Sequence, residues 1–446
     1  MDPDIRRRLE AIFRAAVAAV EPGRLVRESM RADSEGISFR GDGEALALPR
    51  DGIRSLYLVG GGKAGRRMGE AAASILGDRV TAGVLAVPRG QGGTIGPVRF
   101  LDAGHPVPDA GSAVAARRIL SLLRAAGEED LVIALVSGGG SSMISAPAEG
   151  ISAEEMDAVT RILLRSGCDI RSLNVVRKHL SSVKGGRMAA AAYPARVVAL
   201  LLSDTPGDDP SVLASGPFSP DPSTFVEAMR VLVRSRLCAE VPRSVRLHIE
   251  RGVAGSVPET PKPGDPVFDR VRTVPVGSNG TALAAAAAAA RRPGTRVAEL
   301  PGFLGGEARE CGRLFVERLR ALAGSAGGAR EVVLIAGGET TVTVRGSGRG
   351  GRSQEFALAA ALAMREGEGM AVLAAGTDGV DGPTDAAGAY ADDSTAARAR
   401  RAGRDPMDHL ERNDAHSLFR ALSDLLVTGP TGTNVADLAI GTVRLP

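Results

Sequence analysis

Residues 55–71 read SLYLVGGGKAGRRMGEA, an apolar run followed by a glycine loop and the start of a predicted helix. A continuous apolar run of this kind is typical of a strand that is buried on both faces of a parallel sheet. The alternation continues along the chain, with apolar runs at 82–87, 131–136 and 197–202 and predicted helices at 64–76, 112–126 and 153–166. The pattern predicts an α/β fold in which helices cover a parallel sheet.

A second alternating unit follows a break that is rich in proline and glycine. The break, residues 236–270, contains PETPKPGDP, which is typical of an ordered loop or a linker. Further strands are predicted at 271–277, 331–338, 340–346 and 370–376, and the second and third of these nearly abut, which predicts an antiparallel pair. We therefore expect two Rossmann-like α/β/α domains with an active-site cleft between them: an N-terminal domain over 1–235, a connector over 236–270 and a C-terminal α/β domain over 271–446.

The composition limits the classes of partner. The chain has 446 residues, and its 55 basic and 52 acidic side chains leave a net charge of only +3. This balance, together with few aromatic residues, argues against a nucleic-acid binder. The longest run of small apolar residues, 283–290, is too short to span a membrane. Three scattered cysteines and an N-terminus without a signal-peptide pattern predict a cytoplasmic protein.

The glycine loop after the first strand allows more than one interpretation. Gly60, Gly62 and Gly65 satisfy the G-x-G-x-x-G pattern of dinucleotide-binding proteins. The next strand, however, ends without an acid to hold a ribose hydroxyl, and only Arg89 is placed to face a 2′-phosphate. Lys63 lies inside the loop and adds a positive charge, which suits a phosphoryl group in transfer. The plain structural alternative is a tight turn with an exposed lysine.

Polar clusters follow the ends of several other predicted strands, at the edge where open α/β sheets bind ligands. Glycines and hydroxyls at 137–142 would form an anion cradle, and the basic segment 174–189 is either part of a site or a solvated helix face. Asp204 would accept a hydroxyl proton or hold Mg²⁺, and Arg352, in a flexible glycine loop, would swing onto a phosphate. Asp378 would ligate a hard cation or accept a hydroxyl. The candidate residues for binding substrate or nucleotide are Gly61, Gly62, Ser137, Gly138, Gly139, Gly140, Ser141, Ser142, Lys184, Asn279, Glu339, Asp378, Thr431 and Asn434.

Taken together and in order, these segments resemble the type II glycerate kinases, the family whose C-terminal half is called the MOFRL domain. The resemblance runs along essentially the whole chain and rests on GGGKA, GHPVPDAGS, SGGGSS, LNVVRKHLSSVKGGR, SDTPGDDP, GGETTVTVRGSGRGGRSQE, GTDGVDGPTDAAGA and GPTGTNVADL. It implies ATP- and Mg²⁺-dependent phosphorylation of D-glycerate at the 2-hydroxyl. It also implies that Lys63, Asp204 and Arg352 are the active-site residues.

Phosphoryl transfer needs positive groups around the moving phosphoryl, a metal and an aligned acceptor hydroxyl. We expect Lys63 and Arg352, one from each domain, to bind the phosphoryl group, and Asp204 and Asp378 to be the metal-ligand candidates. The partners would be D-glycerate and ATP, without nucleic acid or membrane, and the protein would be a monomer or a homodimer. Two alternatives stay open: an NAD(P)H-dependent hydroxypyruvate reductase, and a non-enzymatic sensor of sugar acids or phosphosugars.

Overall fold

The computed structural model describes residues 1–41 and 45–445, and the chain divides into two compact units. The N-terminal unit comprises Pro22–Ser203 and Asp208–Val276. The C-terminal unit comprises Met1–Glu21, Asp204–Gly207 and Gly277–Pro446. Each unit has an α/β architecture with its own sheet and its own hydrophobic core, as the sequence predicts.

Within the described residues, the N-terminal unit is built on a seven-stranded sheet of order β10-β9-β8-β4-β5-β7-β6. The strands are β4 (Leu56–Gly61), β5 (Ala82–Pro88), β6 (Gly93–Ile95), β7 (Val98–Ala103), β8 (Leu131–Ser137), β9 (Arg196–Leu202) and β10 (Val271–Gly277). The central strands β9, β8, β4, β5 and β7 are parallel, and β6 runs antiparallel to β7. Every residue of β8 is buried, which agrees with the continuous apolar run in its sequence.

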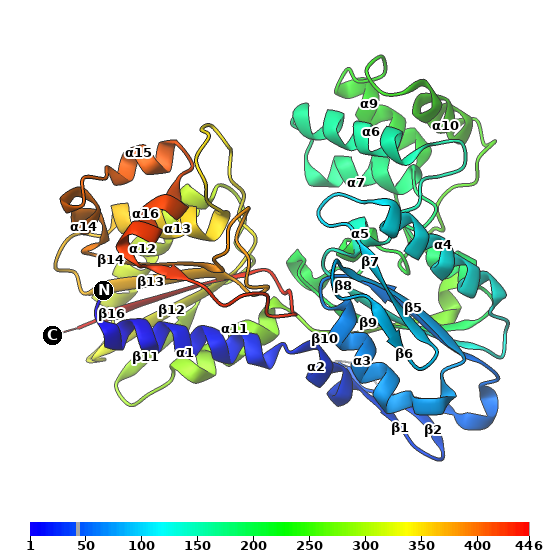
Figure 1. Cartoon of the computed structure of the whole chain (residues 1–446), viewed down its shortest axis with the longest axis horizontal. Helices are drawn as coiled ribbons and strands as arrows, with labels where there is room; N and C mark the ends of the chain where they lie inside the picture. Colours follow the sequence, from blue (N-terminus) through cyan, green and yellow to red (C-terminus); the bar gives the residue numbers. More distant parts are fainter. Residues whose placement is uncertain (42–44, 446) are drawn as a thin grey trace. The chain divides into compact units, whose positions relative to one another are not determined.

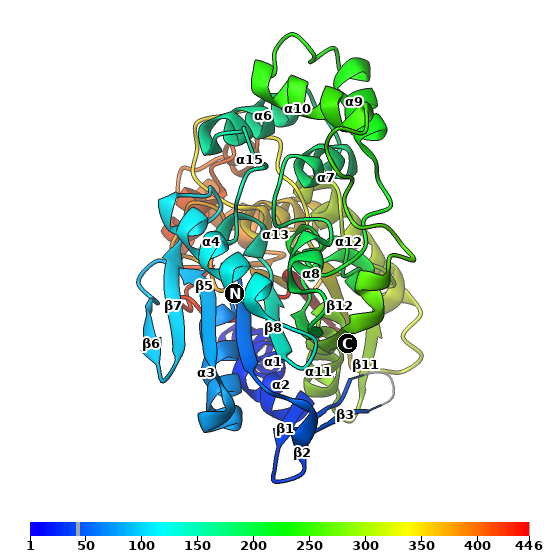
Figure 2. The same ribbon diagram turned by 90° about the vertical axis from the view of Figure 1, so that its right-hand side faces the viewer.

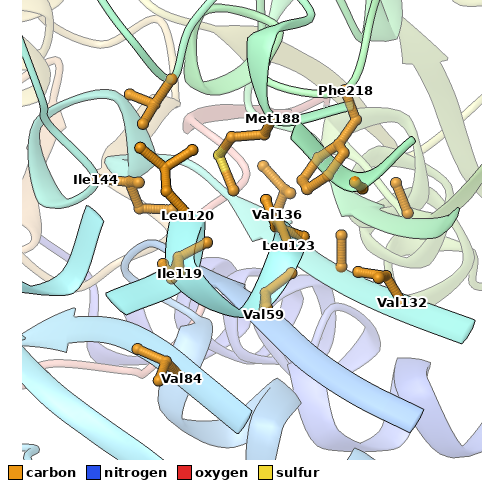
Figure 3. Close-up of a cluster of buried hydrophobic side chains, with 14 of the residues drawn as sticks. Val59, Val84, Ile119, Leu120, Leu123, Val132, Val136, Ile144, Met188 and Phe218 are labelled. Carbon is orange, nitrogen blue, oxygen red and sulfur yellow. The ribbon is translucent and has the colours of Figure 1, made fainter. Parts of the chain in front are cut away.

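The core of the N-terminal unit lies between this sheet and the helices that cover it. Helices α4 (Ala110–Ala125), α5 (Gly140–Met143) and α8 (Arg187–Ala192) belong to this layer, whereas α3 (Gly65–Leu76) packs against Leu85 and Phe100 on the other face of the sheet. Ile119 and Leu123 lie four residues apart on α4, so they share one face, and they pack over Val132 and Val136 of β8 (Figure 3). Phe218 completes the cluster.

Two smaller elements complete the N-terminal unit. Helix α2 (Pro22–Ser29) leads into a three-stranded antiparallel sheet of β1 (Met30–Ala32), β2 (Gly36–Phe39) and β3 (Leu46–Pro49). Helices α6 (Ala153–Arg165), α7 (Ile170–His179), α9 (Phe225–Arg234) and α10 (Arg243–Val253) form a separate helical layer, seen at the top of both views (Figures 1 and 2). This layer has a core of its own around Leu163, Val176 and Phe225.

The C-terminal unit has a mixed sheet, which the described residues form in the order β11-β12-β16-β13-β14-β15. The strands are β11 (Thr295–Glu299), β12 (Glu331–Gly338), β13 (Met370–Gly376), β14 (Gly388–Asp392), β15 (Leu425–Leu426) and β16 (Asp437–Arg444). Among the strands of this sheet that the structure describes, β11 and β12 alone pair in parallel, and β16 runs antiparallel to both of its neighbours. The C-terminal strand is therefore central, and it brings Asp437 opposite Gly338 and Gly376 at one edge of the sheet.

Helices cover both faces of this mixed sheet. Helices α1 (Pro3–Ala19) and α11 (Asn279–Ala290) lie on one face, and α12 (Ala308–Gly324) and α13 (Arg352–Ala363) lie on the other (Figure 1). Phe315 of α12 and Phe356 of α13 meet edge to face, with ring centroids 5.5 Å apart. The remaining helices are α14 (Thr395–Arg401), α15 (Pro406–Glu411) and α16 (Ala415–Leu422). None of the helices in the described ranges has both the length and the apolar character that a membrane crossing requires.

Several elements differ from the expectations drawn from sequence. The predicted connector 236–270 carries α10 and belongs to the N-terminal unit, and β10, expected to open the second domain, joins the first sheet. The amphipathic N-terminal helix α1 belongs to the C-terminal unit, where Arg8 donates to Glu331 at the start of β12. A local pattern predicts that a segment is helical or extended, but it does not reveal which sheet the segment joins.

The predicted strand 340–346 is wrong, and so is its antiparallel pairing with 331–338. Within the segment only Thr341 forms an isolated bridge, to Glu307, and β12 pairs with β16 instead. Side chains satisfy three of the segment's backbone amides: Thr343 N donates to Glu307, and the amides of Arg345 and Gly346 donate to Asn413 Oδ1. Because side chains supply these acceptors, the segment needs no neighbouring strand.

Candidate active site

The glycine loop after β4 interlocks with the loop after β8. Lys63 N donates to Gly138 O at 2.8 Å, and Ala64 N donates to Ser137 Oγ at 3.2 Å. Gly62 N donates to a backbone carbonyl of β5 at 3.1 Å. A β-carbon at Gly62 would lie 2.3 Å from Ser137 Oγ, so glycine is required here for close approach of the two loops. These three amides already have protein acceptors, which speaks against a literal dinucleotide fingerprint.

The side chain of Lys63 lies at the meeting point of three loops. A β-carbon placed on Gly139 would come within 3.2 Å of Lys63 Cγ and 3.0 Å of His105 Cδ2. Gly139 has φ +83°, a left-handed conformation that suits glycine. His105, in the loop after β7, is therefore a neighbour of the half-buried Lys63. Arg89, the candidate for a 2′-phosphate, instead pairs with Asp109 at 2.6 Å.

The loop after β8 also contacts a buried basic cluster. Lys184 Nζ lies 2.6 Å from Ser141 Oγ and also donates to Ser141 O, and Arg177 Nη2 donates to the same hydroxyl at 3.4 Å. Ser215 Oγ lies 2.9 Å from Ser141 Oγ. Burial, assisted by the charge of Arg177, holds the pKa of Lys184 well below its usual value, and burial also lowers the pKa of Arg177. Ser141, Arg177, Lys184 and Ser215 are called the basic cluster below.

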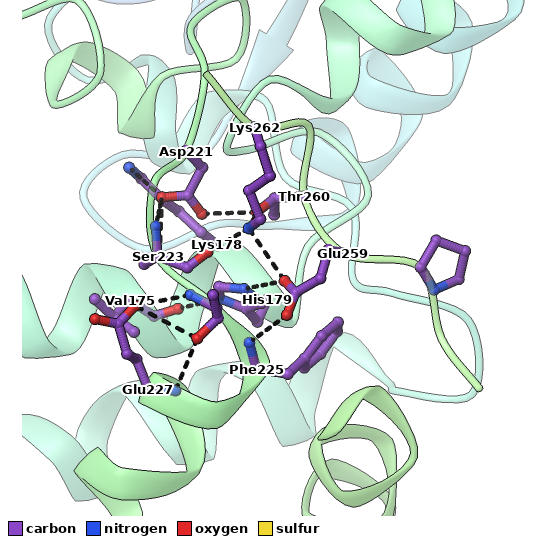
Figure 4. A network of polar contacts seen from close by, with 12 residues as sticks. Val175, Lys178, His179, Asp221, Ser223, Phe225, Glu227, Glu259, Thr260 and Lys262 are labelled. Atoms are coloured by element: carbon purple, nitrogen blue, oxygen red, sulfur yellow. Dashed lines mark hydrogen bonds and ion pairs between the residues drawn. The ribbon is translucent and has the colours of Figure 1, made fainter. Parts of the chain in front are cut away.

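A network of charged side chains anchors the last turn of α7, the helix that also carries Arg177 of the basic cluster (the network is drawn in Figure 4). Lys178 pairs with Asp221 at 3.3 Å, and His179 Nε2 lies 3.1 Å from a carboxylate oxygen of Glu259. Glu259 also accepts a hydrogen bond from Lys262. Lys178, His179 and Lys184 are all buried, so the alternative of a solvated helix face is wrong for these residues. The network is structural and fixes the helix that carries Arg177.

In the C-terminal unit, Arg352 is held by two carboxylates. It is the first residue of α13, whereas the sequence predicts a flexible loop there. Its Nε and Nη2 donate to the two oxygens of Asp437, and its Nη1 donates to Glu339. Burial acts to lower the pKa of Arg352, but the charge of Asp437 and its hydrogen bonds to the guanidinium outweigh burial and raise it above its usual value. The guanidinium is thus fixed in place, with about a third of the side chain exposed.

The side chain of Asp381 caps the start of α13 through hydrogen bonds. Its carboxylate accepts hydrogen bonds from Ser353 N at 3.0 Å and from the backbone and side-chain nitrogens of Gln354, both at 2.9 Å. Burial, and then the nearby charge of Asp437, raises the pKa of Asp381 to about 6. A buried carboxylate therefore positions the helix end that carries Arg352.

The loop 427–437 gathers most of the other predicted residues of this unit. Asn434 Nδ2 donates to Asp204 Oδ2 at 2.7 Å, and Thr431 N donates to Asp378 O at 3.1 Å. Asn279 is buried, and its side-chain nitrogen donates to the carbonyl of Val435 at 2.7 Å. The Asn279 side chain therefore holds the backbone of this loop in place. Asp204, Asp378, Thr431 and Asn434 are thus brought together around one loop.

The donor chemistry of this loop region fits the Mg²⁺ that the sequence predicts. Within 1–41 and 45–445, no group of three or more His, Cys, Asp or Glu side chains is arranged to hold a metal ion. Mg²⁺ bound with a nucleotide commonly uses only one or two carboxylates, because phosphates and waters complete its coordination. The carboxylates of Asp204 and Asp378 meet that smaller requirement.

Sequence reasoning left three residues out of the candidate set. Arg177 and Ser215 join the basic cluster, and Asp437 forms the bidentate pair with Arg352. Arg177 and Asp437 lie inside motifs quoted above, VRKHL and TNVAD, so the signal was present. What the sequence did not show was their contact with residues far away in the chain.

Comparisons with known proteins agree with this architecture. A domain of unknown function, DUF4147, matches residues 8–250, and the MOFRL family matches residues 332–437. The D-glycerate 2-kinase of Thermotoga maritima is 40% identical over 99% of both chains. A protein of Agrobacterium vitis, named provisionally as a hydroxypyruvate reductase, is 39% identical over 98% of this chain and 94% of its own.

A crystal structure gives the same result in three dimensions. The glycerate kinase of Thermotoga maritima superposes with a TM-score of 0.82 at 39% identity, covering 99% of this chain and 100% of that one. The superposed region covers almost the whole chain and therefore includes both units. The chain belongs to the glycerate kinase family with a C-terminal MOFRL domain.

Proposed function

We propose that this protein is a glycerate 2-kinase, which transfers the γ-phosphoryl group of ATP to the 2-hydroxyl of D-glycerate and releases 2-phosphoglycerate and ADP. The observation that carries the proposal is the full-length similarity to glycerate kinases. The cytoplasmic location and the monomeric or homodimeric state stay predictions from the sequence.

Each of the three residues has a role that its chemistry supports. Lys63 supplies a positive charge beside the loop after β8, suited to the oxygens of a moving phosphoryl group. Arg352 supplies a guanidinium that Asp437 and Glu339 hold in one orientation, so no ordering is needed during the reaction. Asp204, held by Asn434, orients the acceptor hydroxyl or accepts its proton.

Asp204 and Asp378 would hold Mg²⁺ together with the nucleotide phosphates. When bound, the ion neutralises charge that develops on the phosphate oxygens. Thr431 and Asn434, in the loop that precedes β16, support these two acids through hydrogen bonds.

The reductase alternative has less support. A dinucleotide fingerprint needs free amides in the glycine loop, and the amides of Gly62, Lys63 and Ala64 are already bonded. The pairing of Arg89 with Asp109 also leaves this side chain occupied. No specific observation favours the other alternative, a non-enzymatic sensor of sugar acids or phosphosugars.

The decisive experiment is incubation of the purified protein with ATP, Mg²⁺ and D-glycerate, followed by phosphorus NMR of the product. We expect ADP and a phosphomonoester on carbon 2. A parallel reaction with hydroxypyruvate and NADH or NADPH, followed by absorbance, tests the reductase. Oxidation of the nicotinamide without any phosphorylated glycerate would replace the proposal.

A further inference from the structure

We propose that the basic cluster binds the carboxylate of the acceptor acid, and that Arg177 is a substrate-binding residue. The inference rests on the proposed function and extends it by assigning the group that recognises the acid end of the substrate. Lys184 and Arg177 approach one hydroxyl, that of Ser141, which lies three residues after Gly138, the acceptor of the hydrogen bond from Lys63 N.

The first argument is unbalanced charge. Lys184 is 1% exposed, and Arg177 Nε is buried without a hydrogen-bond partner in the described part of the chain. Across residues 1–41 and 45–445, no carboxylate forms an ion pair with either cation, although the neighbouring Lys178 has Asp221. Buried charges are normally paired, because desolvation is costly. A buried lysine and a partly buried arginine that share only hydroxyls and a carbonyl are therefore suited to an anion from outside.

The second argument is the conformation of Ser215. Ala214 and Ser215 are consecutive non-glycine residues with φ +51° and +65°, in the left-handed region that side chains disfavour. The backbone is fixed there, because Ser215 O accepts from Gly185 N at 3.0 Å and Ser215 N donates to Val212 O at 2.9 Å. The strained turn places the Ser215 hydroxyl beside Ser141, where it adds a donor to the cluster.

The third argument selects a carboxylate over a nucleotide phosphate. In glycerate the carboxylate carbon is bonded directly to the carbon whose hydroxyl is phosphorylated, so the two recognition sites must be adjacent. The loop after β8 meets this requirement: Gly138 O accepts from the backbone N of Lys63, the residue for the moving phosphoryl group, and Ser141 contacts Arg177 and Lys184. A guanidinium fork, an ammonium and two hydroxyls match the two oxygens of a carboxylate.

The test compares Arg177→Met and Lys184→Met with wild type and with Arg171→Met, an exposed arginine on the same helix. Steady-state kinetics give KM for D-glycerate and for ATP, and a second series uses glycerol, which lacks the carboxylate, as acceptor. We expect each cluster variant to raise KM for D-glycerate on the order of 100-fold. KM for ATP should change less than about 3-fold, and the preference for D-glycerate over glycerol should fall by the same factor. Arg171→Met should match wild type.

Arg177→Lys serves as the conservative variant, since it keeps the charge but loses the fork; we expect it to fall between wild type and Arg177→Met. Calorimetric titration with D-glycerate alone adds a readout that does not need turnover: wild type should bind, and folded Arg177→Met should not.

A rise in KM for ATP with unchanged KM for D-glycerate, or an equal loss of activity with glycerate and with glycerol, would overturn the assignment. If wild type binds D-glycerate but forms no phosphoester, the kinase proposal fails while the carboxylate site stands. Wild type that phosphorylates D-glycerate with no preference over glycerol removes the site but keeps the kinase.

Discussion

The buried carboxylate of Asp381 makes the stability of the protein depend on pH, and Asp381→Asn should remove that dependence. In the folded protein its pKa is raised from 3.8 to about 6, mainly because the group is buried and also because Asp437 lies nearby. The folded state therefore binds a proton more tightly than the unfolded state. The stabilisation from protonated Asp381 is present in full below about pH 4 and is lost as the pH rises through about 6.

The size of the effect follows from the shift. Each pKa unit corresponds to about 1.4 kcal/mol, so a shift of about two units is worth on the order of 3 kcal/mol. The free energy of unfolding of wild type, minus that of Asp381→Asn, should fall by this amount between pH 4 and pH 7. Titrating groups far from Asp381 are common to both proteins and cancel in the difference.

The assay is urea unfolding of both proteins at half-unit steps from pH 4 to pH 7, followed by circular dichroism. Asn keeps an oxygen that accepts from the amides of Ser353 or Gln354, so α13 should stay capped. A difference in unfolding free energy that stays constant over this range, or that rises with pH, refutes the reasoning. An unchanged difference would mean that Asp381 stays ionised throughout, stabilised by its three donors.

Three further predictions address the site and the core. Lys63→Ala should lower kcat for D-glycerate phosphorylation by about 10² to 10⁴, because the ammonium that stabilises the moving phosphoryl group is lost. The melting temperature should change little, and near-normal turnover would show that Lys63 does not act in the site. Arg352→Lys should lower kcat/KM by about 10², because an ammonium cannot reproduce the paired bonds to Asp437, and kinetics equal to wild type would contradict this role. Leu123→Ala should lower the free energy of unfolding by about 3 kcal/mol, because Leu123 is fully buried on α4, with KM values unchanged in the folded variant.

The N-terminal sheet was the most predictable part of the molecule. Strands β4, β5, β8 and β9 lie where the apolar runs predict, because a parallel strand covered on both faces has to be apolar along its whole length. The glycine loop and Lys63 follow directly from such a strand, so their place at the sheet edge could be inferred from a short stretch of sequence.

The C-terminal unit was less predictable, because its sheet depends on pairing between distant segments. Strand β16 enters between β12 and β13 from the end of the chain, and nothing in its own sequence identifies these partners. The pairing brings Asp437 to Arg352, 85 residues away, and thereby turns a predicted flexible arginine into a fixed one.

The amino-acid sequence alone determined the α/β class, the glycine loops at strand ends and the candidate roles of Lys63 and Asp204, since each depends on local pattern and residue chemistry. The tertiary structure decided which sheet β10 joins, where helix α1 packs and which cations surround Ser141. Those features depend on contacts between residues far apart in the chain, and such contacts form only when burial of the whole core outweighs the entropy of closing long loops.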